Sequence, residues 1–257
     1  MLWYKAWYET RWRFIVGLIL LTALSAGLVL FYPMMLRLLG LPEVNAVMKG
    51  AAFSDSFQQA LAMMSAFTGY IWSQWFGKNL LQIWAVFAIL IGSGGLTTES
   101  TRGSLLFTLA LPVSRRKLVT ARTAMGFVQL SVLVFLPSIL IPVMAPVIGE
   151  RFSVKTTLVC SLIFTLSGTV FFSFSCLLST FFSDLVKPIV IGLCVLFMSV
   201  IVTSLPLKIN DYSVFKVMSG QSYYLKGEIP WIGLLICIGL SIAMFFFAFR
   251  NIEHRDF

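Results

Sequence analysis

Long apolar runs that contain no charged residue are the dominant feature of this chain. Charged residues divide the sequence into six such runs, each about 20 residues or longer, which is the length that lets a helix cross the roughly 30 Å hydrocarbon core of a bilayer. A soluble domain has no means of burying so much unbroken apolar surface. The chain is therefore predicted to be an all-α membrane protein with six transmembrane helices. These are expected at residues 14–35, 75–98, 118–141, 157–182, 188–207 and 229–249.

The composition agrees with a membrane location. Of all residues, 59% are hydrophobic and only 11% are charged, whereas soluble domains average roughly 25% charged residues. The net charge of +9 comes from short basic runs beside the apolar segments, an arrangement that sets membrane topology rather than one that binds nucleic acid. We therefore expect membrane lipids, and no nucleic acid, among the partners.

Residue types that carry out catalysis or bind metals are scarce. His254 is the only histidine, so neither a Ser–His pair within the membrane nor a multi-histidine metal site is expected. The four cysteines all lie inside apolar runs and form no Cys-x-x-Cys pair. The chain has no phosphate-binding loop, because the one Gly-Lys dipeptide, Gly77-Lys78, is followed by Asn79. We predict no catalytic, cofactor-binding or metal-binding residue, and an energy source in a separate subunit.

The distribution of basic residues predicts the orientation. With the N-terminus in the cytoplasm, eleven Lys and Arg residues fall inside and eight fall outside, in line with the excess of basic residues in cytoplasmic loops. The strongest contribution is the basic cluster 115–117, flanked by Arg102 and Arg122. Both termini are therefore expected in the cytoplasm.

Two segments are expected to lie at the membrane surface. Residues 1–13 carry aromatic and basic side chains at helical spacing, which predicts a short interfacial helix on the cytoplasmic face. Residues 57–77 are uncharged but rich in Gln, Ser and Trp, and we interpret them as an outer interfacial helix leading into the second crossing. A seventh crossing here is the alternative, although it would place the basic cluster outside. Pro137, Pro142 and Pro146 predict a kinked or broken outer end of the third crossing.

The cytoplasmic loop 99–117 is the most specific part of the sequence. It reads E-x-x-R-G-S, then an apolar stretch, then L-P-V-S-R-R. The apolar stretch is too short to cross a membrane, but two turns of helix would place its leucines on one face, a surface suited to a groove on another protein. A glycine permits the turn into this stub and a proline ends it. The candidate residues for coupling to a partner are Glu99, Arg102, Gly103, Ser104, Leu105, Leu106, Leu109, Pro112 and Arg115.

This loop resembles the hallmark of the ABC-2 family of transporter permeases, and the likeness in helix order covers essentially the whole chain, 1–257, as one transmembrane domain. The resemblance implies a multi-pass permease subunit in a cell membrane, such as the bacterial plasma membrane, with loop 99–117 acting as a coupling helix that docks on an ABC ATPase. It also implies a second permease subunit, identical or homologous. ATP and Mg would be bound by the partner ATPase and not by this chain. The expected activity is export of a hydrophobic or amphipathic cargo, such as a lipid, a drug or a membrane-active peptide, through a dimer interface.

Two other functions remain open at this point. A permease-like subunit could bind a membrane-active compound as a sensor or immunity protein without moving it. An intramembrane enzyme or a secondary carrier is disfavoured, because such proteins generally need ionisable residues deep within their crossings and this chain has none there.

Overall fold

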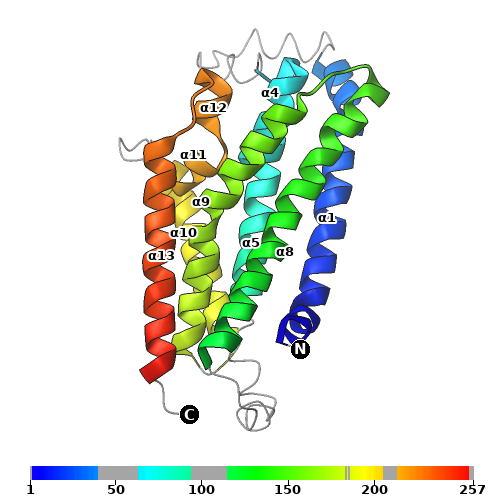
Figure 1. Cartoon of the computed structure of the whole chain (residues 1–257). Coiled ribbons are helices and arrows are strands. Elements are labelled where there is room, and N and C mark those ends of the chain that lie inside the picture. The colour runs from blue at the N-terminus through cyan, green and yellow to red at the C-terminus, as the bar shows by residue number, and fades with distance from the viewer. Residues whose placement is uncertain are drawn as a thin grey trace.

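The computed structural model describes residues 2–39, 63–93, 115–182, 184, 186–204 and 213–254, and within these ranges the secondary structure is helical with no strand. Six long helical segments make up the bundle in Figure 1. They are α1 (Leu2–Leu39), α4–η1–α5 (Phe67–Ile71, Trp72–Asn79 and Leu80–Ser93), α8 (Arg115–Met144), α9 (Val154–Phe181), α10 (Val186–Ser204) and α13 (Trp231–His254). The short helices η2 (Ala145–Ile148), α11 (Val214–Met218) and α12 (Gln221–Lys226) lie between them.

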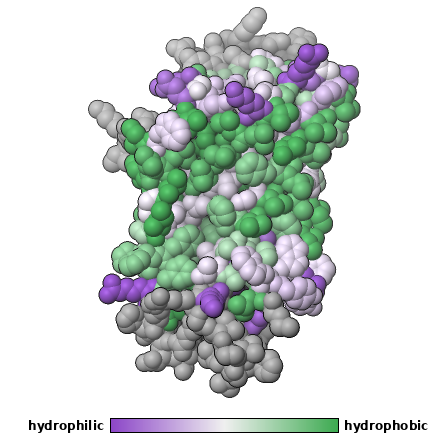
Figure 2. Space-filling model, in the orientation of Figure 1, coloured by the Kyte–Doolittle hydropathy of each residue, from purple (hydrophilic) through white to green (hydrophobic). Residues whose placement is uncertain are grey.

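The long helices stand side by side, and the N- and C-termini lie at the same end of the bundle (Figure 1). On the face shown in Figure 2, a broad apolar belt covers the middle of the molecule and hydrophilic residues lie toward both ends. In the described part of the chain, five helical segments are long and apolar enough to cross a membrane, and α10 contributes a shorter apolar stretch, Val186–Ile201. The chain is therefore a multi-pass membrane protein. The sequence predicts six crossings. Five described segments are long enough to span a membrane, and the predicted fifth crossing, α10, is shorter than the others.

Two helical segments form the interior of the bundle. Within their most apolar stretches, 67% of α9 and 61% of the segment containing α5 are buried, against 28% of α1, 33% of α8 and 28% of α13. Close packing at small residues helps to explain the position of α9, because small side chains let helices approach closely in lipid. A Cβ atom at Gly168 would lie 2.5 Å from the ring of Trp84 on α5. The indole of Trp84 in turn donates a 2.9 Å hydrogen bond to the Leu130 carbonyl of α8.

The second crossing begins earlier in the structure than the sequence predicts. Residues 67–77, expected in an interfacial helix, are continuous with α5 and partly adopt the wide π-helical geometry of η1. Trp75 and Phe76 in this segment are buried. Burial of this partly polar stretch is possible because neighbouring helices provide hydrogen-bond partners for its side chains. The Trp75 indole, for example, donates to the Ser138 hydroxyl of α8 at 2.9 Å.

The N-terminal segment, expected to form a short interfacial helix, is helical in the structure. Residues 2–13 are continuous with the first crossing in a single helix, α1. The first turns, beside the N label in Figure 1, run at an angle to the rest of this helix. Trp3, Tyr4 and Trp12 are exposed there, as expected for aromatic side chains at a membrane surface. In the third crossing, α8 continues through Pro137 and Pro142 and ends at Met144, and the short helix η2 that follows contains Pro146.

Candidate functional site

The predicted coupling residues lie between α5 and α8, and the structure describes both of these helices. Arg115 is the first residue of α8, and Ser93 is the last residue of α5. Both helix ends lie at the end of the bundle that holds the termini (Figure 1). The other predicted coupling residues lie outside the described residues: Glu99, Arg102, Gly103, Ser104, Leu105, Leu106, Leu109 and Pro112.

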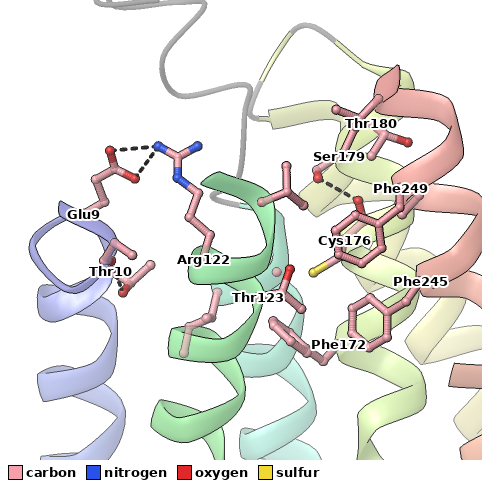
Figure 3. Close-up of a pocket in the computed structure, with 16 residues that line it drawn as sticks. Glu9, Thr10, Arg122, Thr123, Phe172, Cys176, Ser179, Thr180, Phe245 and Phe249 are labelled. Atoms are coloured by element: carbon pink, nitrogen blue, oxygen red, sulfur yellow. Dashed lines mark hydrogen bonds and ion pairs between the residues drawn. The ribbon is translucent and has the colours of Figure 1, made fainter. Parts of the chain in front are cut away.

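A small cavity lies at this same end of the bundle, between α1, α5, α8, α9 and α13. Its volume is about 50 Å³, enough for one or a few water molecules. Glu9 and Arg122 lie on one side of the cavity, and Phe172, Phe245 and Phe249 gather on the other (Figure 3). The remaining lining residues are Ala6, Thr10, Ile91, Gly92, Val119, Thr123, Cys176, Ser179, Thr180, Ala248 and Ile252.

An ion pair joins α1 to α8 beside the cavity. One terminal nitrogen of the Arg122 guanidinium lies 2.9 Å from Oε1 and 2.8 Å from Oε2 of Glu9. The Arg122 side chain is 10% exposed and the Glu9 side chain 21% exposed, so the pair is largely withdrawn from water. Removing either member would leave the other charge poorly solvated, which makes such pairs costly to break.

A second contact joins α1 to the end of α5. The Arg13 guanidinium donates to the Leu90 carbonyl, which also accepts from the Ser93 hydroxyl at 3.1 Å. Leu90 lies in the last described turn of α5, and a charged guanidinium is a strong donor to a carbonyl oxygen. The N-terminal part of α1 therefore contacts both α5 and α8, the helices on either side of segment 94–114. We call the contacts of Glu9 with Arg122 and of Arg13 with Leu90 the α1 clamp.

The remaining contacts at this end tie α9 to its neighbours. The Ser175 hydroxyl donates to the Ile89 carbonyl of α5 at 2.7 Å, and a Cβ atom at Gly92 would lie 2.8 Å from the Ser175 Cβ. The Asn251 amide of α13 donates to the Thr180 hydroxyl at 2.9 Å. The last described turns of α5 are thus joined to α9, and α9 is joined to α13, through packed and hydrogen-bonded groups.

The sequence analysis did not identify the α1 clamp. Glu9 is the only acidic residue before Glu43, and Arg122 stands apart from the basic cluster 115–117. A lone carboxylate in a basic, aromatic helix is a signal that an arginine elsewhere pairs with it. That signal does not say which arginine, since Glu9 and Arg122 are 113 positions apart.

No metal centre is found in the part of the chain that the structure describes, where no three His, Cys, Asp or Glu residues come together. Two polar side chains buried among the described helices, Gln129 and Ser161, have atoms without a hydrogen-bond partner there. They lie on α8 and α9 and do not line the cavity. The cavity at this end is lined by both apolar side chains and polar ones, among them the Glu9–Arg122 ion pair.

The geometry is that of a helical membrane protein in which α1 contacts both α5 and α8, the helices on either side of the predicted coupling loop. A family model described as ABC-2 family transporter protein matches residues 10–223 of the 257. The chain therefore belongs to the ABC-2 family of transporter proteins and is a membrane permease. The matched range runs from α1 into α12 and ends before α13. No curated protein and no solved structure matches the chain.

Proposed function

We propose that this permease is the transmembrane subunit of an ATP-driven ABC transporter that exports a hydrophobic or amphipathic cargo. The observation that carries the proposal is the α1 clamp, which holds both helices that flank the loop resembling a coupling helix. The ABC-2 family generally works with an ABC ATPase partner. In this proposal the ATPase binds ATP and Mg, docks on loop 99–117, and moves the ends of α5 and α8.

The mechanical step follows from the contacts at the inner end. When the ATPase displaces the coupling loop, the displacement acts on α5 and α8, whose described ends are Ser93 and Arg115. Because Arg13 holds the end of α5 and Glu9 holds α8, the two helix ends and α1 move together. A packed bundle passes such displacements on to neighbouring helices, because close-packed interiors do not deform continuously.

The topology of the proposal has six crossings with both termini in the cytoplasm. In Figure 1 the six long helical segments alternate in direction, so that the termini and both ends of loop 94–114 meet at one end of the bundle. With α10 as the sixth crossing, this arrangement puts the basic cluster 115–117 on the side of the termini, in agreement with the excess of basic residues in cytoplasmic loops.

The cargo class follows from the crossings. Their buried polar groups in the described bundle are mainly hydroxyls, and most of these bond to the carbonyls of their own helix, as Thr165 and Ser167 do at 2.8 and 2.7 Å. A pathway built from such helices has no fixed charge with which to bind an ion. Hydrophobic or amphipathic molecules suit it better, either within one subunit or between two identical or homologous permeases.

The proposal is tested by reconstituting the permease in liposomes with its ABC ATPase and following a fluorescent lipid analogue. We expect movement of the analogue that requires both subunits and ATP. The matched control is an ATPase variant whose phosphate-loop lysine is replaced. Movement without the ATPase would refute the proposal in favour of a secondary carrier, and cargo-stimulated ATP hydrolysis without movement would favour a sensor or immunity subunit.

A further inference from the structure

The helix α1 stands at the edge of the bundle (Figure 1), and its first turns hold an arginine against two aromatic rings. The guanidinium carbon of Arg11 lies 3.7 Å from the centre of the Tyr8 ring and 5.5 Å from the centre of a Trp12 ring. Cations within about 6 Å of a ring centre are attracted to the face of the ring. Tyr8 and Trp12 are 52% and 66% exposed, so they hold the guanidinium at the surface of the molecule. We call these three residues the Arg11 site.

The charge of Arg11 has no counterion in the described part of the chain. Its guanidinium makes neither an ion pair nor a hydrogen bond with any described residue. Two nearby arginines differ in this respect, because Arg13 donates to the Leu90 carbonyl and Arg122 pairs with Glu9. A contact with an aromatic face positions a guanidinium but leaves its positive charge and its N–H donors available. Such a fork of donors suits an anion with several oxygens, such as a phosphate.

The Arg11 site lies where the apolar surface of α1 begins. Tyr8, Trp12 and Val16 are spaced four residues apart in one helix and therefore share a face of α1. Val16 and Ile19, which are 55% and 63% exposed, continue this face as apolar surface. The first crossing is expected to start at residue 14, so Arg11 lies within one turn of the membrane boundary. Tyr and Trp side chains are enriched at this depth, where the phosphates of a lipid leaflet also lie.

We propose that the Arg11 site binds an anionic phospholipid of the leaflet at the end of the bundle that holds the termini. Arg11 donates to the phosphate oxygens, Tyr8 and Trp12 hold the guanidinium in place, and an acyl chain lies along Val16 and Ile19. An anionic lipid is preferred to a zwitterionic one, because a zwitterionic headgroup brings a second positive charge close to Arg11. The bound lipid would anchor the first turns of α1, the part of the helix that makes the α1 clamp.

This site does not depend on ATP-driven transport, so its test uses the purified permease without an ATPase. Native mass spectrometry would follow the binding of phosphatidylglycerol, which is anionic, and of phosphatidylcholine with the same acyl chains. Arg11→Gln removes the charge, and the double variant Tyr8→Leu, Trp12→Leu removes the rings but keeps the charge. Lys187→Gln is the matched control. Lys187 is an exposed lysine at the start of α10, at the same end of the bundle, and its charge already pairs with Asp184 at 2.7 Å.

We expect phosphatidylglycerol to bind more tightly than phosphatidylcholine. Arg11→Gln should lower the phosphatidylglycerol affinity about fivefold and the double ring variant about threefold, with no change in Lys187→Gln. Circular dichroism and gel filtration would show that the variants remain folded. Full affinity in folded Arg11→Gln or in the folded ring variant, or an equal loss in Lys187→Gln, would overturn the assignment. Displacement of the lipid by an equal concentration of inorganic phosphate would overturn the lipid and identify a site for free phosphate.

Discussion

The ion pair between Glu9 and Arg122 should contribute measurably to the stability of the bundle. At a separation of 2.8 Å, an effective dielectric constant of about 20 corresponds to a gross attraction of roughly 6 kcal/mol. Withdrawal of both charges from water offsets most of that attraction. Hydrogen bonds to charged groups contribute about 1.5–3 kcal/mol net. With side chains only 10% and 21% exposed, we expect Glu9→Gln to lower the free energy of unfolding by about 2 kcal/mol.

The chain offers a matched control for this change. Lys187 and Asp184 form an ion pair of nearly the same length, 2.7 Å, but their side chains are 63% and 51% exposed. Exposed pairs of this kind contribute less than about 1 kcal/mol because water and salt screen them. Asp184→Asn should therefore change the free energy of unfolding by much less than Glu9→Gln.

Thermal unfolding of the detergent-solubilised protein, followed by tryptophan fluorescence, would measure both effects. A loss of about 2 kcal/mol corresponds to a fall in Tm of about 4–8 °C for a chain of this size. A double-mutant cycle with Arg122→Gln would isolate the pairwise energy. Equal Tm values for Glu9→Gln and Asp184→Asn would refute the reasoning that burial makes the first pair strong.

Three further predictions concern topology, docking and packing. Single cysteines should be labelled from outside the cell at Ser56 and only from inside at Ser114, and outside labelling at Ser114 would contradict the proposed orientation. Leu106→Asp should reduce co-purification of the ATPase without preventing membrane insertion, because it places a charge in an apolar contact; unchanged co-purification would rule out docking through this leucine. Gly168→Ala should lower the free energy of unfolding by about 1–3 kcal/mol, because the new Cβ would lie 2.5 Å from the Trp84 ring. Gly27→Ala meets nothing within 4 Å and is the control, so equal stability of the two variants would show that the contact at Gly168 relaxes without cost.

The sequence alone determined the class of the protein and the approximate positions of its helices. A bilayer imposes a length and a composition on each crossing separately, so these properties can be recognised within one segment at a time. The ABC-2 resemblance rested likewise on a local motif in loop 99–117. The start of the second crossing was harder to predict, because Trp72 and Trp75 resemble interfacial residues until their partners, the Ser219 carbonyl and the Ser138 hydroxyl, are known.

Only the tertiary structure decided which helices pack against one another and how the ends of α1, α5 and α8 are joined. The buried segments that contain α5 and α9 are less hydrophobic than the outward-facing α1 and α13. The residues that bury them lie on other helices, however, and a single segment does not contain that information. The contacts of Glu9 with Arg122 and of Arg13 with the Leu90 carbonyl join residues 113 and 77 positions apart. Their geometry follows from the packing of three helices, and no local pattern in the chain encodes that packing.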